Sequence, residues 1–255
     1  MCCFLATGPT GCGKTTTIYA IVKVLNTREK NIATIEDPVE YDIEGVNQIQ
    51  VNPKTNLTFA EGLRSILRQD PDIMFVGEVR DQETAKIAIN SAMTGHLVLS
   101  TVHTNDAATT LPRLLDMNVE PFLVASTVNL ICAQRLIRLI CTNCVVSKEL
   151  SVAELVKKID PKLIAKHFQN RKTIRVSEGA GCPVCHYSGF AGRIGIFELL
   201  IVTESIRKLI TEKATSSEIA AKAVEEGMTL MVEDGLRKVE RGLTTIEEVL
   251  RVTKS

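Results

Sequence analysis

The sequence predicts an α/β fold with a mainly parallel sheet, followed by a region of different character. In the first half of the chain, short apolar runs alternate with segments whose apolar residues recur at helical spacing. This alternation is typical of parallel strands joined by helices that cover both faces of a sheet. A glycine-rich turn follows the first apolar run. Beyond about Cys132 the alternation ends, and paired cysteines and then short helical segments follow.

Five segments are expected to form strands of the sheet. Most are short apolar runs, as fully buried strands require, whereas Gln48–Val51 alternates polar and apolar residues and is expected at an edge. The expected strands are Cys2–Ala6, Asn31–Ile35, Gln48–Val51, Ile73–Val76 and Leu97–Ser100. A further strand-like run, Arg135–Ile140, leads into the first cysteine pair.

Helices are expected where a capping residue precedes apolar residues spaced three and four apart. Thr58 and Glu61 form a capping-box pattern, and Asp81 can cap the next helix by accepting a backbone hydrogen bond. The expected helices are Thr15–Leu25, Phe59–Gln69 and a segment from Asp81 through Met93.

Short helices are also expected in the second half. Ser151 and Glu154 form a capping-box pattern in the polar stretch between the cysteine pairs, and Thr245 and Glu248 form another before the last helix. Glycine is favoured just beyond the C-terminus of a helix. The two expected helix stops are Gly227 and Gly242.

The composition is that of an ordinary globular protein. The 255 residues correspond to about 1.7 domains, and 45% apolar with 24% charged residues exclude a disordered chain. The 30 basic and 30 acidic side chains leave no net charge, so no polybasic field predicts binding to nucleic acid. The longest uncharged apolar stretch, Phe122–Cys132, is shorter than the ~20 residues of a membrane-spanning helix. The N-terminus lacks the basic start and apolar core of a signal peptide.

The turn after the first strand matches the phosphate-binding pattern G-x-x-x-x-G-K-[ST] without a mismatch. Its glycines let backbone N–H groups surround a polyphosphate, and the next helix directs its positive end toward it. Lys14 is expected to reach the β/γ oxygens, and the Thr15 hydroxyl to bind Mg²⁺. An ordinary glycine turn is the alternative, but the position between a strand and a helix favours a nucleotide site. The expected nucleotide-binding residues are Gly8, Pro9, Thr10, Gly11, Cys12, Gly13, Lys14, Thr15 and Thr16.

Acidic residues follow two of the expected strands at the edge where a nucleotide would bind. Hydrolysis requires a carboxylate that orients water, and the carboxyl ends of parallel strands are where ligands bind. Glu78 follows four apolar residues and Gly77, a Walker B-like pattern with glycine where aspartate is commoner. Glu36 follows the second strand. For Asp37 or Glu40 alone, an ordinary loop start is a fair interpretation.

Polar and basic residues near these carboxylates are further candidates. The cluster Thr101–Asn105 follows another expected strand, and His103 within it could donate a hydrogen bond to the γ-phosphate. The pattern supports a helix-capping role for the cluster equally well. Arg80, two residues past Glu78, is expected to contact phosphate in its own or a neighbouring subunit. Arg64 and Arg68 lie four apart and are expected on a solvated helix face.

Four of the eight cysteines form two Cys-x-x-Cys pairs, which predict a structural zinc site. Four thiolates can close a tetrahedral Zn²⁺ site. The loop between the pairs exceeds the ~15–20 residues of many zinc sites, but doubling a loop costs only about 0.6 kcal/mol. A redox dithiol is the main alternative, and buried free thiols are another. The expected ligands are Cys141, Cys144, Cys182 and Cys185, with His186 incidental and Cys2, Cys3, Cys12 and Cys132 as small apolar fillers.

Four blocks of the sequence resemble the type II secretion and type IV pilus assembly ATPases. Gly8–Thr17 resembles the Walker A motif of that family with its threonine run, and Leu67–Asp81 resembles its Walker B signature. Thr34–Glu40 resembles its Asp box and Gly95–Asn105 its His box. The likeness continues through Gly192–Glu198 to the C-terminal helices, so it covers nearly the whole chain.

The resemblance implies a RecA-like P-loop ATPase core with an inserted tetracysteine zinc subdomain and a C-terminal helical subdomain. By this resemblance Glu78 is the hydrolytic carboxylate, Glu36 assists at the water or Mg²⁺, and His103 reports on the γ-phosphate. The implied domains are the core at 1–135, the zinc-binding subdomain at 136–200 and the helical subdomain at 201–255.

The implied function is ATP hydrolysis that powers assembly of type IV pili or type II secretion pseudopili. The resemblance implies a cytoplasmic homohexameric ring, peripheral at the inner membrane, that acts through platform and accessory proteins, with ATP, Mg²⁺ and structural Zn²⁺. It implies no nucleic acid partner and no direct membrane span.

Two alternatives stay open. One is a nucleotide- and zinc-binding fragment with little ATPase activity of its own. The other is a pilus-retraction ATPase, which the four cysteines disfavour because that branch of the family lacks the module. The chain begins on its first core strand, whereas members of the family carry N-terminal domains upstream. We therefore expect either a fragment or truncated reading frame, or upstream domains supplied by a separate chain.

Overall fold

The computed structural model describes residues 2–156, 159–168 and 172–253, which fold into two compact units. The first unit comprises Met1–Gln134 and Glu198–Met228, and the second comprises Arg135–Phe197 and Thr229–Ser255. The predicted C-terminal helical region therefore contributes to both units. The division into three functional domains stays a prediction.

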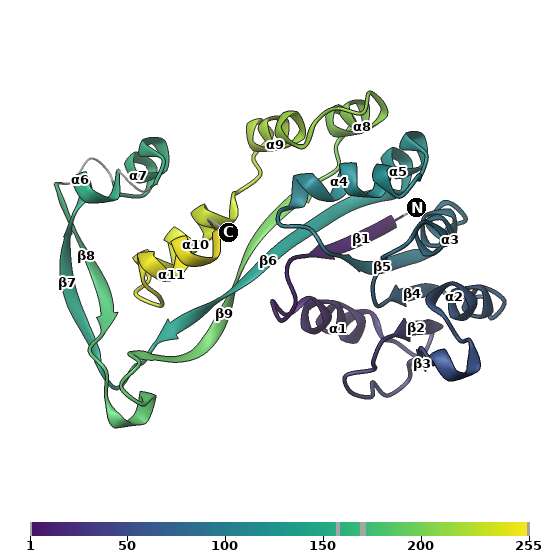
Figure 1. Ribbon diagram of the computed structural model, residues 1–255, viewed down its shortest axis with the longest axis horizontal. Coiled ribbons are helices and arrows are strands. Elements are labelled where there is room, and N and C mark those ends of the chain that lie inside the picture. The colour runs from purple at the N-terminus through teal and green to yellow at the C-terminus, as the bar shows by residue number, and fades with distance from the viewer. Residues whose placement is uncertain (1, 157–158, 169–171, 254–255) are drawn as a thin grey trace. The chain divides into compact units, whose positions relative to one another are not determined.

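The first unit is built around parallel strands, as the alternating sequence pattern predicts. Its sheet has the order β3-β2-β4-β5-β1-β6-β9, and the pairings from β3 through β6 are parallel (Figure 1). Every residue of β2 and β4 is buried, so both faces of the sheet are covered. The first five strands are β1 (Cys2–Thr7), β2 (Ile32–Glu36), β3 (Asn47–Gln50), β4 (Ile73–Val76) and β5 (Leu97–Val102).

Helices separate these strands along the chain. Helix α1 packs its apolar face, Ile18, Tyr19 and Val22, against strand residues that include Phe75 and Leu99. This packing fixes the start of α1 beside the end of β1. The helices of the first unit are α1 (Lys14–Leu25), α2 (Phe59–Leu67), α3 (Gln82–Met93), α4 (Ala107–Asp116), α5 (Pro121–Thr127), α8 (Glu204–Thr211) and α9 (Ser216–Glu225), with a short 3₁₀ turn at Pro53–Thr55.

Strands β6 (Val128–Ile140) and β9 (Phe190–Ile201) are longer than the sequence patterns predict. The predicted run Arg135–Ile140 is only the second part of β6, and no strand was expected at 190–201. Gly189, with φ of 75°, directly precedes β9, but neither strand has the strict alternation of polar and apolar residues by which a half-buried strand is recognised.

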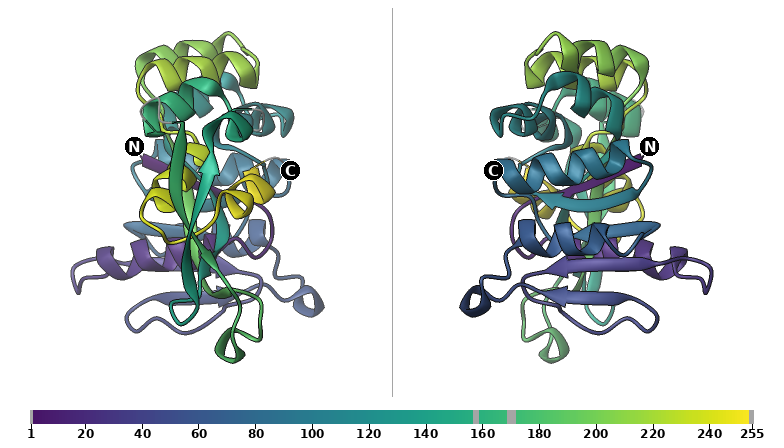
Figure 2. Two further views of the ribbon diagram at one scale, coloured as in Figure 1. Left: turned by 90° about the vertical axis from the view of Figure 1, so that its left-hand side faces the viewer. Right: turned by 90° about the vertical axis from the view of Figure 1, so that its right-hand side faces the viewer.

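The second unit contains an antiparallel ribbon that the sequence analysis did not predict. Strands β7 (Val145–Ser151) and β8 (Thr173–Gly179) run side by side (Figures 1 and 2). The first five residues of β7 are exposed, so its sequence lacks the alternation by which a half-buried strand is recognised. The other elements of this unit are α6 (Val152–Leu155), α7 (Pro161–Phe168), a 3₁₀ turn at Pro183–Cys185, α10 (Met231–Glu240) and α11 (Ile246–Thr253).

The predicted Asp81 cap is confirmed, since its side chain accepts a hydrogen bond from the Thr84 backbone N–H, but the capping boxes predicted at Thr58 and Ser151 are not complete. The Thr58 side chain accepts a hydrogen bond from the Glu61 backbone N–H, but the Glu61 carboxylate pairs with Arg64 at 2.6 Å instead of returning to Thr58. Ser151 precedes α6 without a side-chain cap, and the Glu154 side chain lies outside the described residues. The glycine stops are confirmed, since Gly227 and Gly242 follow α9 and α10 with positive φ.

In the part of the chain that the structure describes, none of the helices combines the length and the apolar character needed to cross a membrane.

Candidate functional site

The predicted phosphate-binding loop connects the end of β1 to the first residue of α1. Gly11 and Gly13 have φ of 76° and 91°, a left-handed conformation that side chains with a Cβ adopt only with strain. Gly13 is the N-cap of α1, and Lys14 is its first residue. The glycine spacing in the sequence thus has the backbone role that the motif requires.

The N-terminus of α1 differs from those of its neighbours. Helices α2, α3 and α4 are capped by the side chains of Thr58, Asp81 and Asp106. Helix α1 has neither a side-chain cap nor an acidic residue in its first turn. Its N-terminal dipole is therefore not offset by a protein side chain, which favours an anion such as phosphate at this end.

Lys14 lies inside the loop that it is predicted to serve. Its Nζ donates to the carbonyl oxygens of Gly8 at 2.9 Å and Pro9 at 3.1 Å, and the residue is only 9% exposed. The ammonium group thus lies against the loop backbone, where it can neutralise phosphate oxygens. The side chains of Cys3, Cys12 and Cys132 are buried, as the filler interpretation predicts.

Glu78 lies at the tip of β4, between two backbone hydrogen bonds that fix the chain. The Gly77 N–H donates to Ile35 of β2 at 2.8 Å, and the Val79 N–H donates to Thr101 of β5 at 2.9 Å. The Glu78 side chain is 10% exposed. A buried carboxylate therefore lies at the same edge of the parallel sheet as the phosphate-binding loop.

The structure brings together three of the four predicted catalytic residues. The Glu78 carboxylate forms an ion pair with Arg80 through Oε1, and its Oε2 lies 3.1 Å from His103 Nε2. Arg80 and His103 are substantially exposed, with 65% and 45% of their side chains accessible. Both can therefore approach a ligand at this edge.

The fourth predicted catalytic residue, Glu36, has a separate hydrogen-bond environment. Its carboxylate accepts hydrogen bonds from the hydroxyl of Tyr19, from Thr34 Oγ1 at 2.6 Å and from Gln48 Nε2 at 3.1 Å. Burial and the bond to Glu36 raise the pKa of Tyr19. In the described residues no hydrogen bond or ion pair joins the Glu36 carboxylate to Glu78. Sequence analysis missed Tyr19 and Gln48, because both resemble ordinary core and edge-strand residues.

A threonine contact links the phosphate-binding loop to the loop that carries His103. The Oγ1 atoms of Thr7 and Thr104 lie 2.5 Å apart, and the Thr104 N–H donates to Thr7 Oγ1 at 3.1 Å. Thr7 immediately precedes Gly8, and Thr104 immediately follows His103. The two loops therefore have a fixed separation.

Arg64 is engaged on the helix surface rather than at the sheet edge. It pairs with Glu61 of its own helix and with Glu83 of α3, as the solvated-face interpretation predicts. Arg68 is exposed at the end of α2.

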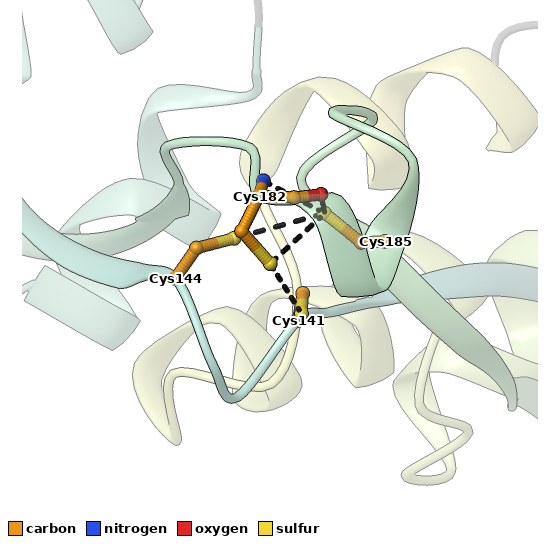
Figure 3. A group of neighbouring side chains, drawn as sticks. All are labelled: Cys141, Cys144, Cys182 and Cys185. Atoms are coloured by element: carbon orange, nitrogen blue, oxygen red, sulfur yellow. Dashed lines mark hydrogen bonds between the residues drawn. The ribbon is translucent and has the colours of Figure 1, made fainter.

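In the second unit, the four paired cysteines converge on one point (Figure 3). Their sulfur atoms all lie within 4.8 Å of one another. Sγ of Cys182 lies 3.9 Å from Cys141 and 3.7 Å from Cys185, and Cys185 lies 3.8 Å from Cys144. A tetrahedron of thiolates at the usual zinc–sulfur distance has edges of about 3.8 Å. The donor set therefore fits a four-coordinate zinc ion.

The backbone around the cysteines favours metal binding. A Cβ added at Gly179 would lie 2.0 Å from the carbonyl oxygen of Gly189, so only glycine permits the end of β8 to approach the turn before β9 this closely. Burial raises the pKa of the Cys144 thiol to about 12. Burial also raises the pKa of the Cys185 thiol, but backbone N–H groups of Cys182 and Gly189 and the neighbouring sulfurs outweigh it and lower that pKa to about 6. This favours the thiolate that a metal requires. His186 is exposed and lies outside the cluster, as predicted.

The comparisons with known proteins concern nearly the whole chain. Residues 1–251 match the model of a family described as type II/IV secretion system protein. The chain is 47% identical over 251 residues to type II secretion system protein E of Pseudomonas aeruginosa, covering 98% of this chain and 48% of that protein. It is 49% identical over 253 residues to the type IV pilus assembly ATPase PilB of Acinetobacter baylyi, covering 98% and 42%. The chain thus spans about half the length of the curated relatives that it matches.

Solved structures share the fold. A crystal structure of the pilus retraction motor PilT with bound ADP superposes with a TM-score of 0.71 at 30% identity, over 99% of this chain and 61% of that one. The ATPase DotB of Legionella pneumophila superposes with a TM-score of 0.68 at 24% identity, over 99% and 60%, which bears on the fold alone.

Proposed function

The chain belongs to the type II/IV secretion system protein family, and from this we propose that it binds and hydrolyses ATP to power assembly of type IV pili or type II secretion pseudopili. The observation that carries the proposal is the placement of a complete phosphate-binding loop and a buried carboxylate, Glu78, at one edge of one parallel sheet. The relatives matched at 46–49% identity are named as secretion or pilus-assembly proteins. The retraction motor is matched at 30%, which favours assembly over retraction.

The chain's own residues supply the groups that phosphoryl transfer to water requires. Backbone N–H groups of the loop and the Lys14 ammonium would hold the phosphates, and Glu78 would orient the attacking water. The water oxygen bonds to the γ-phosphorus as the bond to the bridging oxygen of ADP breaks. His103 and Arg80, both beside Glu78, would contact the transferred phosphoryl group, and Glu36 would support the water from the neighbouring strand.

Two metal ions belong to the proposal. The Thr15 hydroxyl would hold Mg²⁺, which when bound neutralises charge on the phosphate oxygens. Cys141, Cys144, Cys182 and Cys185 would hold a structural Zn²⁺ with no open coordination position.

We propose that the protein acts as a homohexameric ring in the cytoplasm, peripheral at the inner membrane through platform and accessory proteins. The relatives named as a type II secretion system protein and a type IV pilus assembly ATPase support action within such a system, and the ring, its location and its partners follow from the resemblance to the family. The balanced charge of the chain, with 30 basic and 30 acidic side chains, agrees with protein partners rather than nucleic acid. The three predicted domains would act as catalytic core, zinc-clipped support and helical accessory region.

The proposal is tested by steady-state phosphate release from ATP with the 255-residue chain. Lys14→Ala removes the charge that neutralises the phosphates, and we expect its rate to fall by about 10²-fold or more. Lys30→Ala is the matched control, because Lys30 forms an exposed ion pair with Asp72 at 3.2 Å. This variant should hydrolyse ATP at the wild-type rate.

Equal rates for wild type and Lys14→Ala would contradict hydrolysis by this chain. Calorimetric titration with ADP would then separate the two remaining outcomes. Binding without turnover would identify a nucleotide-binding fragment, and no binding would reject the nucleotide site.

A further inference from the structure

A buried amide side chain outside the predicted site contacts both the phosphate-binding loop and the helix that follows it. Gln134, in β6, is 2% exposed. Its Nε2 donates to the carbonyl oxygen of Cys12 at 2.7 Å, and its Oε1 accepts from Thr17 Oγ1 at 2.8 Å. One amide therefore joins the loop to the first turn of α1.

The register of the sheet explains why Gln134 reaches this position. β1 pairs with β6 up to Thr7 opposite Ala133. Gln134 is the next residue of β6, and Gly8, the first residue of the loop, is the next residue after Thr7. The strand thus delivers the amide at the level where the loop begins.

The contact is close as well as buried. A Cβ added at Gly13 would lie 3.2 Å from Gln134 Nε2, so the amide packs directly on the glycine that precedes Lys14. If the Gln134 amide were removed, the buried Cys12 carbonyl would lose this hydrogen bond, and its desolvation would no longer be compensated. The two bonds therefore restrain the loop from Cys12 through Thr17, the stretch that holds Lys14 and Thr15.

We propose that Gln134 is a positioning residue for nucleotide binding, acting through Cys12 and Thr17 to hold the loop in its phosphate-binding shape before the ligand arrives. This rests on the proposed function. A loop held in its bound shape avoids the entropy of ordering on binding. Gln134 touches no phosphate itself; its effect on affinity passes through the loop backbone.

The test is the dissociation constant for ADP, measured by calorimetric titration in the presence of Mg²⁺. Gln134→Leu removes both bonds at similar size, and Thr17→Val removes one. We expect each to weaken ADP binding by about tenfold, the scale of a lost buried hydrogen bond. Thr17→Ser keeps the hydroxyl and should bind ADP like wild type. The double variant should lose less than the product of the two single losses, because both remove one shared bond.

The control is Thr127→Val. Thr127 is buried, and its hydroxyl donates to the backbone carbonyl of Leu123 within α5 at 2.7 Å. It should lower the melting temperature while leaving the ADP affinity unchanged, which separates loss of a buried hydroxyl from loss of the loop contact.

The outcomes distinguish this proposal from the proposed function. If wild type binds ADP, Lys14→Ala does not, and folded Gln134→Leu binds like wild type, the positioning role is wrong and the nucleotide site stands. If wild type itself fails to bind ADP, the proposed function fails. Should Gln134→Leu not fold, equal affinities of Thr17→Val and Thr17→Ser would overturn the positioning role.

Discussion

Two carboxylates at neighbouring strand tips, Glu36 and Glu78, have different surroundings although the sequence presents them alike. Glu78 pairs with Arg80 and His103, which are exposed toward solvent. Glu36 accepts hydrogen bonds from a buried tyrosine and from residues of β2 and β3. The sequence could place both at strand ends. It could not assign their partners, because Tyr19 and Gln48 come from elements distant in the chain.

Glu78→Gln tests the catalytic assignment at the level of one side chain. The amide preserves size but cannot orient and polarise water as a carboxylate does, so we expect hydrolysis to fall by about 10²–10⁴-fold with ATP affinity retained. Phosphate release and nucleotide titration measure the two effects separately. Glu83→Gln is the control, since Glu83 forms a surface pair with Arg64. Unchanged turnover in Glu78→Gln would remove Glu78 from the mechanism.

At the scale of single elements, residues that cap helices also make contacts that sequence motifs do not specify. The Glu248 backbone N–H donates to Thr245 Oγ1 at 3.3 Å at the start of α11, as the capping pattern predicts. Its carboxylate instead binds Arg138 of β6 at 2.5 Å and Arg251 at 2.9 Å. Local spacing thus predicted where the helix begins, but not the arginine that arrives from a strand over a hundred residues earlier in the chain.

This arginine–carboxylate cluster makes a prediction about acid stability. The Glu248 carboxyl is desolvated, which raises its pKa, but the two arginines lower it more, from 4.5 to about 2. Because the pKa of Glu248 is lower in the folded than in the unfolded chain, its ionised carboxylate stabilises the fold at any pH above the unfolded-state pKa of about 4.5. That contribution is lost as the pH falls from about 4.5 toward about 2.

Glu248→Gln should therefore lower the free energy of unfolding by about 2 kcal/mol at pH 7, and its difference from wild type should shrink as the pH falls from about 4.5 toward about 2. Urea unfolding followed by circular dichroism measures both values. Glu247→Gln is the control variant, because Glu247 is adjacent to Glu248 in the chain but is exposed. A difference between Glu248→Gln and wild type that stays constant with pH would contradict the role of the ion pairs.

The strands of the second unit show where sequence periodicity carries no information. Short apolar runs predict strands at Leu97–Ser100 and Ile73–Val76, and the structure confirms them as the almost entirely buried β5 and β4. The β7–β8 ribbon is mostly exposed along β7, so neither an apolar run nor an alternation marks it. Spacing of cysteines, in contrast, was sufficient to predict the cluster, because the chemistry of four thiolates does not depend on the fold around them.

At the scale of the whole molecule, zinc would join segments far apart in the chain. The cluster connects Cys141 and Cys144, after β6, to Cys182 and Cys185, before β9. We expect one zinc per chain by elemental analysis and its loss in Cys182→Ser, with a lower melting temperature because a structural metal stabilises the folded state. Cys132→Ala should keep its zinc, since Cys132 lies outside the cluster. A folded, zinc-free wild-type protein would contradict this prediction.

Each compact unit is built from two separate stretches of the chain, and these stretches alternate along the sequence. The first unit receives residues 198–228 only after the second has begun at residue 135. During synthesis, the last strand and helices of the first unit therefore emerge from the ribosome after the cysteine segment. No single truncation point separates the molecule into two intact halves. A shortened chain that ends before residue 228 would leave the first unit incomplete.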